Sequence, residues 1–166
     1  MNVADELTPV VLTWDDVART VDALAGQILA DRTPDVVVGV LRGGLVPAVL
    51  LGHKVGVRSL RAVEVTHTID DSVGAEKSRA PRVVNAASLG DLTGMDVLLI
   101  DDIAGSGDTL ACTINLLHAA GAVRVRTAVL TVNHANWRRP QSPADVVTYL
   151  GDVVDRWVIF PWEGTA

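Results

Sequence analysis

The chain has 166 residues, 49% of them hydrophobic, which is enough to fill the core of one domain. Its formal net charge of −6 argues against a broad surface for nucleic-acid phosphates, and its single cysteine, Cys112, excludes an internal disulfide and a cysteine-based zinc site. No run reaches the roughly 18 apolar residues of a membrane span. We therefore expect a cytoplasmic protein that binds a small molecule and neither nucleic acid nor a membrane.

The first predicted element is an amphipathic helix that begins after Thr13 and ends near Asp31. Thr13 is a suitable N-cap, and Asp16 stands three residues later, as in a capping box. Apolar residues then recur at helical spacing and predict the buried face: Val17, Val21, Leu24, Ile28 and Leu29.

The remainder of the chain alternates between predicted strands and helices. Short apolar runs predict strands over residues 35–41, 59–66, 97–101 and 123–132, and helices are predicted over 44–54 and 108–120. Two short apolar runs, 146–150 and 157–160, close the sequence. Because strands that alternate with helices form right-handed crossovers, we predict an α/β fold with a mostly parallel, twisted sheet flanked by helices.

One long segment does not fit this alternation. Residues 67–94 are polar and show neither helical nor strand periodicity. A stretch of this length in a compact domain is typically a functional loop, so we predict a flap over about 67–85.

The stretch VLLIDDIAGSGDTL, residues 97–110, contains the first candidate site. Its apolar strand leads into Asp101 and Asp102 and then into a loop with glycines at 105 and 107. Backbone amides of such a loop, the positive end of the next helix, and the hydroxyls of Ser106 and Thr109 could hold a phosphate without lysine. The carboxylates would face sugar hydroxyls or magnesium-bound water. An ordinary strand-to-helix turn has the same residue types, so this loop alone leaves both interpretations open.

A second turn repeats this design. Residues 36–51 run from an apolar strand into Arg42, Gly43 and Gly44 and then into a helix with Pro47 in its first turn. An arginine beside two glycines can bind a second anion, because the guanidinium and the neighbouring backbone N–H groups can share its oxygens. Two anion-binding turns that flank a pair of carboxylates predict a ligand with phosphate at one end, pyrophosphate at the other and a sugar between them.

These segments resemble the type I phosphoribosyltransferase family, whose members use phosphoribosyl pyrophosphate (PRPP). Residues 97–109 resemble the PRPP signature of the family, and Leu41-Arg42-Gly43-Gly44 resembles its pyrophosphate loop. The opening LTWD (12–15) and the closing WVIFPWE (157–163) are similar to those of short microbial xanthine-guanine and hypoxanthine-type enzymes. The resemblance covers nearly the whole chain and implies one domain, 1–166, with a base-recognition hood over about 133–163.

The resemblance implies a role for each matching position. The 5-phosphate of PRPP would be bound by Ile103, Ala104, Gly105, Ser106, Gly107, Asp108 and Thr109. Pyrophosphate would be bound by Leu41, Arg42, Gly43 and Gly44, with a cis peptide before Arg42. Asp101 and Asp102 would approach the ribose hydroxyls, in contact with Mg²⁺ through water, and would be the catalytic residues together with Arg42. The base would be bound by Asn133, Trp157, Val158 and Ile159, and the flap would contribute Asp70, Asp71, Lys77 and Arg79.

The implied activity is transfer of the 5-phosphoribosyl group from PRPP to a nucleobase, with Mg²⁺ chelated mainly by PRPP and a homodimer or homotetramer as the assembly. Two positions depart from the 6-oxopurine enzymes of the family. Gly105 replaces an aspartate that assists proton removal, and Asn133 replaces a lysine that reads the 6-oxo group, while His134 is a further candidate base. A purine is favoured, but a pyrimidine such as cytosine, an unusual base, or a PRPP-sensing regulator with little catalysis remain open.

Overall fold

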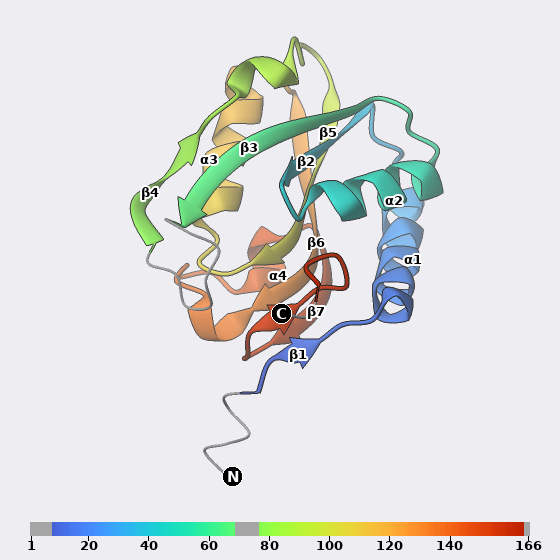
Figure 1. The fold of residues 1–166 in the computed structure, drawn as a ribbon. Helices are drawn as coiled ribbons and strands as arrows, with labels where there is room; N and C mark the ends of the chain where they lie inside the picture. The colour runs from blue at the N-terminus through green and yellow to red at the C-terminus, as the bar shows by residue number, and fades with distance from the viewer. Residues whose placement is uncertain (1–7, 69–76, 165–166) are drawn as a thin grey trace.

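The computed structural model describes residues 8–68 and 77–164, and in these ranges the predicted α/β architecture is confirmed (Figure 1). The main sheet has the strand order β4-β3-β2-β5-β6-β7, and all neighbours are parallel except β3 and β4. Its strands are β2 (Val36–Leu41), β3 (Leu60–Thr68), β4 (Lys77–Val83), β5 (Asp96–Ala104), β6 (Arg124–Asn133) and β7 (Tyr149–Val154). The longer helices are α1 (Trp14–Asp31), α2 (Leu45–Val55) and α3 (Asp108–Ala119).

The first helix begins as its sequence predicts. The Thr13 hydroxyl accepts the N–H of Asp16 at 3.2 Å, and the Asp16 carboxylate accepts the N–H of Thr13 at 2.8 Å, which completes the capping box. Four of the five apolar positions are buried, but the prediction for Leu29 is wrong, because its side chain is 51% exposed. Leu29 follows Ile28 by one residue, a rotation of about 100° that turns it away from the sheet.

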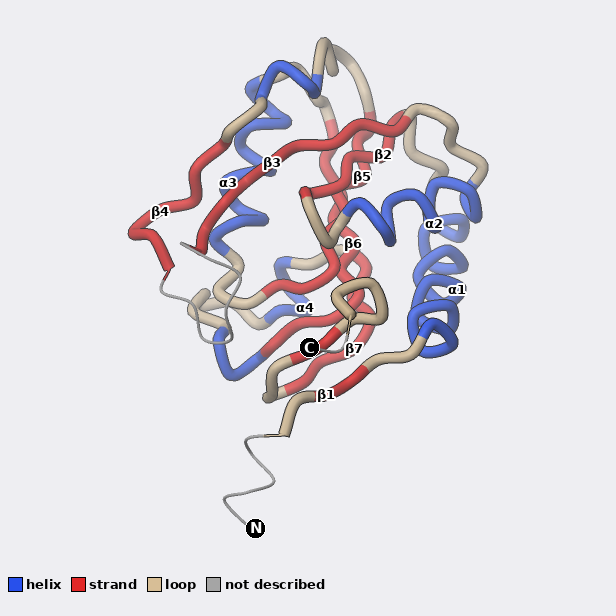
Figure 2. Tube along the Cα trace, viewed as in Figure 1, coloured by secondary structure: helices blue, strands red, loops and turns tan. Residues whose placement is uncertain are grey.

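The sheet is covered on both faces. Alternate residues of β2 and β5 point to opposite sides: Val37 and Leu98 pack with α1 and α2, whereas Val38 and Leu99 pack with α3. Figure 2 shows the strands between these two helical layers. This burial on both faces explains why the strands are apolar runs without alternation.

The polar segment 67–94 contains more regular structure than its sequence indicates. β4 runs antiparallel to β3 along the outer edge of the sheet, and the 3₁₀ helix η1 (Ala86–Leu89) follows it. Neither element was predicted, and β4 was missed because an edge strand needs little apolar periodicity to pair through its backbone. Asp70 and Asp71 lie outside the described residues.

Strand β5 is longer than predicted, and this extension bears on the candidate site. It does not end at Asp101 but continues to Ala104, because β6 extends beside it and pairs with Ile103 and Ala104. On its other side β5 pairs with β2 only as far as Gly39 and Ile100. Asp101 and Asp102 therefore lie where β5 has lost one of its two neighbours.

The C-terminal segment differs from prediction in one place. The predicted run 146–150 is split between the short helix α4 (Pro143–Val146) and the start of β7. The run 157–160 contains β8 (Val158–Ile159), which pairs in parallel with β1 (Val10–Val11) and so joins the first and last described segments. Within the described ranges, no helix is long and apolar enough to cross a membrane.

A buried ionic cluster lies at the opposite end of the sheet from Ala104, the last residue of β5. The Arg126 guanidinium is buried and donates to both carboxylate oxygens of Asp96, at 3.1 and 2.9 Å. It also donates to the Tyr149 hydroxyl and the Arg32 carbonyl, each at 2.7 Å. Tyr149 in turn donates to Asp31 at 2.7 Å, so the cluster ties β5, β6 and β7 to the end of α1.

We expect Arg126→Ala to lower the free energy of unfolding by about 3 to 5 kcal/mol, because Asp96 would remain buried without its main partner. Urea unfolding followed by circular dichroism measures this change. The matched control is Arg19→Ala, which removes an exposed ion pair with Asp16 and should cost less than about 1 kcal/mol. Equal losses in the two variants would contradict the assignment of a stabilising role to the buried cluster.

Candidate active site

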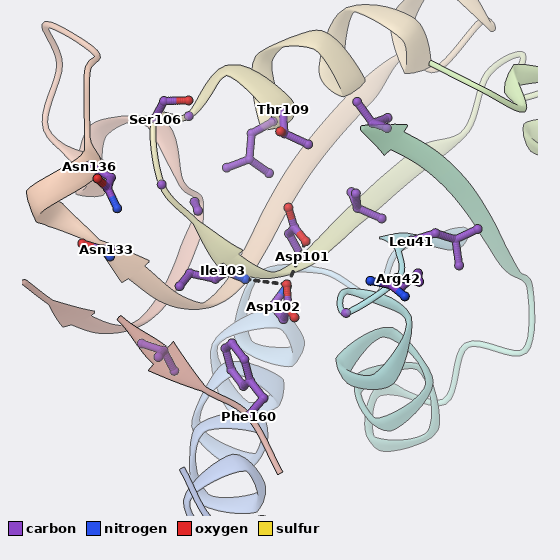
Figure 3. Close-up of a pocket in the computed structure, with 18 of the residues that line it drawn as sticks. Leu41, Arg42, Asp101, Asp102, Ile103, Ser106, Thr109, Asn133, Asn136 and Phe160 are labelled. Atoms are coloured by element: carbon purple, nitrogen blue, oxygen red, sulfur yellow. Dashed lines mark hydrogen bonds between the residues drawn. The ribbon is translucent and has the colours of Figure 1, made fainter. Parts of the chain in front are cut away.

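The two predicted anion-binding turns meet at the carboxyl ends of neighbouring strands. From β2 the chain passes to β3, and from β5 it passes to β6; these two steps run along the sheet in opposite directions. β2 and β5 therefore flank the point where the strand order reverses. Ligands of open α/β sheets bind at such a point. The turn after β2 contains Arg42, and the loop after β5 contains Ser106 (Figure 3).

A pocket of about 300 Å³ lies between these turns. Most of the predicted site residues line it: Leu41, Arg42, Gly43, Asp101, Asp102, Ile103, Ala104, Gly105, Ser106, Gly107, Thr109, Asn133, Trp157 and Val158. Three predicted residues, Gly44, Asp108 and Ile159, do not line it. Gly44 instead packs between strands, since a Cβ there would lie 2.6 Å from the Val40 carbonyl oxygen and 2.8 Å from that of Ile100.

The turn after β2 is pressed against the carboxylates. The peptide Leu41-Arg42 is cis, as the family resemblance implied. A Cβ placed on Gly43 would overlap the Oδ2 atom of Asp102, so a larger residue here would have to displace that carboxylate. Figure 3 shows Arg42 and Asp102 on facing sides of the same space.

The loop after β5 has the features of an anion cradle. Gly107 adopts φ 82°, a left-handed conformation that favours glycine, and α3 starts at the next residue. The hydroxyl oxygen of Ser106 accepts the N–H of Asp108 at 3.3 Å, which leaves the hydroxyl hydrogen available as a donor. Arg139 supports the loop from outside through the Gly107 carbonyl at 3.3 Å and the Asp108 carboxylate at 3.6 Å.

Asp101 and Asp102 are nearly buried, with 7% and 8% of their surface exposed. Burial, followed by the neighbouring charge of Asp102, raises the pKa of Asp101 well above its ordinary value. Burial also raises the pKa of Asp102 to about 6, although the N–H of Ile103 donates to its carboxylate at 2.8 Å and opposes the shift. The backbone N–H groups of Asp102 and Ile103 thus compensate the two charges only in part, and a bound cation or hydroxyl donors would compensate them further.

The carboxylates fit a magnesium ion whose other ligands come from a substrate. Among the described residues, no group of three or more His, Cys, Asp or Glu side chains could hold a metal ion. Mg²⁺ commonly binds through one or two carboxylates together with substrate phosphates and water. Asp101 and Asp102 are therefore candidates for contact with an ion that arrives with the substrate.

The pocket also has aromatic and neutral polar residues in its wall. Trp157, with 39% of its surface exposed, and the buried Phe160 both line it. Phe160 stacks on Trp162, with ring centroids 4.7 Å apart. Asn133, at the end of β6, and Asn136 add neutral polar groups.

Six lining residues were not predicted as site residues: Val40, Val65, Leu110, Asn136, Phe160 and Glu163. The carboxylate of Glu163 accepts the N–H of Phe160 at 2.8 Å, and its charge adds to the raised pKa of Asp102. A glutamate within the quoted segment 157–163 was the available signal for it. Asn136 carries no comparable signal, because the 3₁₀ turn η2 (His134–Asn136) that places it was not predicted.

Other predicted residues are outside the pocket or cannot be placed. His134 does not line the pocket; its Nδ1 atom lies 3.3 Å from the carboxylate of Asp155. Lys77 and Arg79 belong to β4, but their side chains, like Asp70 and Asp71, are outside the described part of the structure. The role of the flap stays a prediction.

Comparisons with known proteins agree with this geometry. Residues 11–163 match the model of the phosphoribosyl transferase domain. The chain belongs to this family. A xanthine-guanine phosphoribosyltransferase from Cereibacter sphaeroides is 30% identical over 161 residues, covering 92% of this chain and 85% of that protein.

Solved structures share the fold. A purine phosphoribosyltransferase from Pyrococcus horikoshii is 32% identical and has a TM-score of 0.75, with 95% of each chain covered. A hypothetical protein from Neisseria gonorrhoeae with bound ppGpp has a TM-score of 0.76, with 95% of this chain and 90% of that chain covered. Its identity of 22% shows a common fold alone.

We expect Gly43→Ala to reduce PRPP binding and turnover roughly 100-fold, because the added methyl group must displace Asp102 or the turn. Calorimetric titration with PRPP and Mg²⁺ measures the binding. The matched control is Gly26→Ala in α1, where a Cβ meets nothing within 4 Å. Unchanged binding in Gly43→Ala would contradict the role of this contact.

We expect Asp102→Asn to stabilise the ligand-free protein at pH 8 by roughly 1 to 3 kcal/mol. The pKa of about 6 lies above the ordinary value of 3.8, so ionisation of the carboxylate costs free energy in the folded protein. The cost begins near the unfolded pKa of 3.8 and is complete above about 6, so most of the advantage of the variant should be gone at pH 4.

Urea unfolding at pH 4 and pH 8 tests this expectation. Asp15→Asn, at an exposed position in α1, serves as the control and should show no such gain. A variant that is no more stable than the parent at pH 8 would contradict the free-energy cost that we assign to the buried charge of Asp102.

Proposed function

We propose that this protein transfers the 5-phosphoribosyl group from PRPP to a purine base and releases pyrophosphate. The main support for this proposal is that two glycine turns from neighbouring strands meet around Asp101 and Asp102 in one pocket. PRPP has an anion at each end of a ribose, which matches this arrangement. The names of the relatives favour a purine over the pyrimidine alternative.

The loop after β5, residues 105–109, which we call the phosphate loop, would bind the 5-phosphate through its backbone amides and the hydroxyls of Ser106 and Thr109. The N-terminus of α3 adds a partial positive charge at the same place. Pyrophosphate would lie beside Arg42 and the amide of Gly43, in the part of the cleft that Arg42 shares with Asp102 and Glu163. This binding would fix the ribose between two anchored ends.

In the reaction, the bond from C1 of the ribose to the pyrophosphate oxygen breaks, and a bond from a ring nitrogen of the base to C1 forms. Pyrophosphate leaves with the electron pair of the broken bond, and the base loses its ring proton to water or to a neighbouring group. Asp101 and Asp102 would accept hydrogen bonds from the ribose hydroxyls and support the positive charge that develops on the sugar. Magnesium bound with PRPP would supply neutralisation of the pyrophosphate charge.

The base would stack against the aromatic residues of the pocket wall. Trp157 offers a partly exposed ring there, and the backbone of Val158 lies beside it to read the edge of the base. Positioning of the base nitrogen against an anchored ribose is the main catalytic contribution that this geometry supports. Closure of residues 67–85 over the pocket and a homodimeric or homotetrameric assembly stay predictions.

We expect pyrophosphate release when the protein is incubated with PRPP, Mg²⁺ and a purine, and no release after chelation of the metal with EDTA. A coupled pyrophosphate assay across adenine, guanine, hypoxanthine, xanthine and cytosine measures it. Binding of PRPP without turnover on any base would overturn the enzyme and favour the sensor alternative.

We expect the double variant Asp101→Asn/Asp102→Asn to lose roughly 100-fold or more in kcat while it stays folded. The control is Asp15→Asn, which lies outside the pocket and should keep the parent rate. Parental turnover in the double variant would disprove the role of the carboxylates.

A further inference from the structure

The phosphate loop packs against the segment that follows η2, residues 137–141. A Cβ placed on Gly107 would lie 3.1 Å from the Cγ atom of Arg139 and 3.2 Å from two ring carbons of Trp137. The indole N–H of Trp137 donates to the Gln141 carbonyl at 2.8 Å, which ties the segment to itself. Neither Trp137 nor Arg139 lines the pocket, so both contact the loop from behind.

Arg139 reaches two groups at the start of α3. Its Nη2 atom donates to the Gly107 carbonyl at 3.3 Å and lies 3.6 Å from the Oδ1 atom of Asp108. The same Gly107 carbonyl accepts the N–H of Ala111 at 3.1 Å, which is the first backbone hydrogen bond of α3. The guanidinium therefore holds the peptide that joins the phosphate loop to the helix.

Asp108 is the one charged residue in the sequence of the phosphate loop. A carboxylate in the first turn of a helix favours the helix, because the free N–H groups there carry partial positive charge. The same carboxylate repels a phosphate dianion that binds to this turn. The guanidinium of Arg139 cancels this charge locally, so the N–H groups of the loop can attract the phosphate.

Folding stability does not explain the position of Arg139. A cation beside a helix N-terminus opposes the helix dipole. The ion pair with Asp108 leaves 31% and 43% of the two side chains exposed, and such pairs contribute little to stability. The Nε atom of Arg139 is also buried without a hydrogen-bond partner among the described residues, which is unfavourable. These costs point to a role that appears when an anion binds to the loop.

We propose that Arg139 is a positioning residue for the 5-phosphate. It holds the peptide between Gly107 and Asp108 from behind and neutralises the Asp108 carboxylate, so that the phosphate loop accepts a dianion. This inference rests on the proposed function, which assigns the 5-phosphate to this loop. Loss of Arg139 should therefore weaken binding of the 5-phosphate end of PRPP and leave the pyrophosphate end unaffected.

Calorimetric titration of Arg139→Ala with three ligands tests the proposal: PRPP with Mg²⁺, ribose 5-phosphate, and pyrophosphate with Mg²⁺. We expect PRPP and ribose 5-phosphate to bind roughly 10-fold more weakly than to the parent protein. The affinity for pyrophosphate should not change, and this arm also shows that the variant is folded. The matched control is Arg138→Ala, which removes the same charge from the exposed neighbouring residue and should keep all three affinities.

Two results of this titration would overturn the inference. The first is parental affinity of Arg139→Ala for ribose 5-phosphate. The second is an equal loss of affinity for ribose 5-phosphate and pyrophosphate, because it would show a general disturbance of the pocket instead of an effect at the phosphate loop.

A double variant tests the neutralising role by itself. In Arg139→Ala/Asp108→Asn, the carboxylate that no longer faces the guanidinium is replaced by a neutral amide of the same shape. We expect its affinity for ribose 5-phosphate to return to within roughly threefold of the parent value. A double variant that binds no better than Arg139→Ala would overturn the neutralising role of Arg139.

The turnover assay separates failure of this inference from failure of the proposed function. Pyrophosphate release by the parent, with parental affinity of Arg139→Ala for ribose 5-phosphate, would overturn the role of Arg139 and leave the transferase intact. Weaker binding of ribose 5-phosphate by Arg139→Ala, with no release by the parent from any base, would overturn the transferase and keep the role of Arg139.

Discussion

The site depends on the separation of β2 from β5 beyond Gly39 and Ile100. Up to that point the two strands are hydrogen-bonded neighbours, and after it each follows its own turn. The turn after β2 returns against β5, where Gly43 packs on the carboxylate of Asp102. One change in strand pairing therefore brings an arginine turn, two carboxylates and the glycine loop after β5 around the same pocket.

Electrostatics explain why this arrangement suits a ligand better than the empty protein. Asp101 and Asp102 are buried side by side, and burial raises the pKa of each because the backbone N–H donors offset only part of the cost of the charges. Asp96, at the other end of the sheet, is also buried, but two nitrogens of the Arg126 guanidinium donate hydrogen bonds to its carboxylate. The first pair is suited to binding and the second to stability, although both consist of buried aspartates.

Much of the fold and of the site could be predicted from residue patterns. The capping box at Thr13 and the apolar runs of the inner strands depend on local sequence, and they were placed within a few residues. The glycine turns around Arg42 and Gly107 were also predicted, since close backbone packing and a left-handed φ both require glycine. Strand β4 was missed because its pairing at the edge of the sheet is made by the backbone, which leaves little trace in side-chain type.

The sequence by itself determined which kind of site to expect, because aspartates, glycines and an arginine after apolar strands favour anions and sugar hydroxyls as ligands. The tertiary structure decided which of these residues share a pocket, that Glu163 and Asn136 join them, and that Gly44, Asp108 and Ile159 do not. It also decided that Oδ1 of Asn133 has no partner. The reason is that burial and hydrogen-bond pairing depend on segments distant in the chain, which no local pattern of residues records.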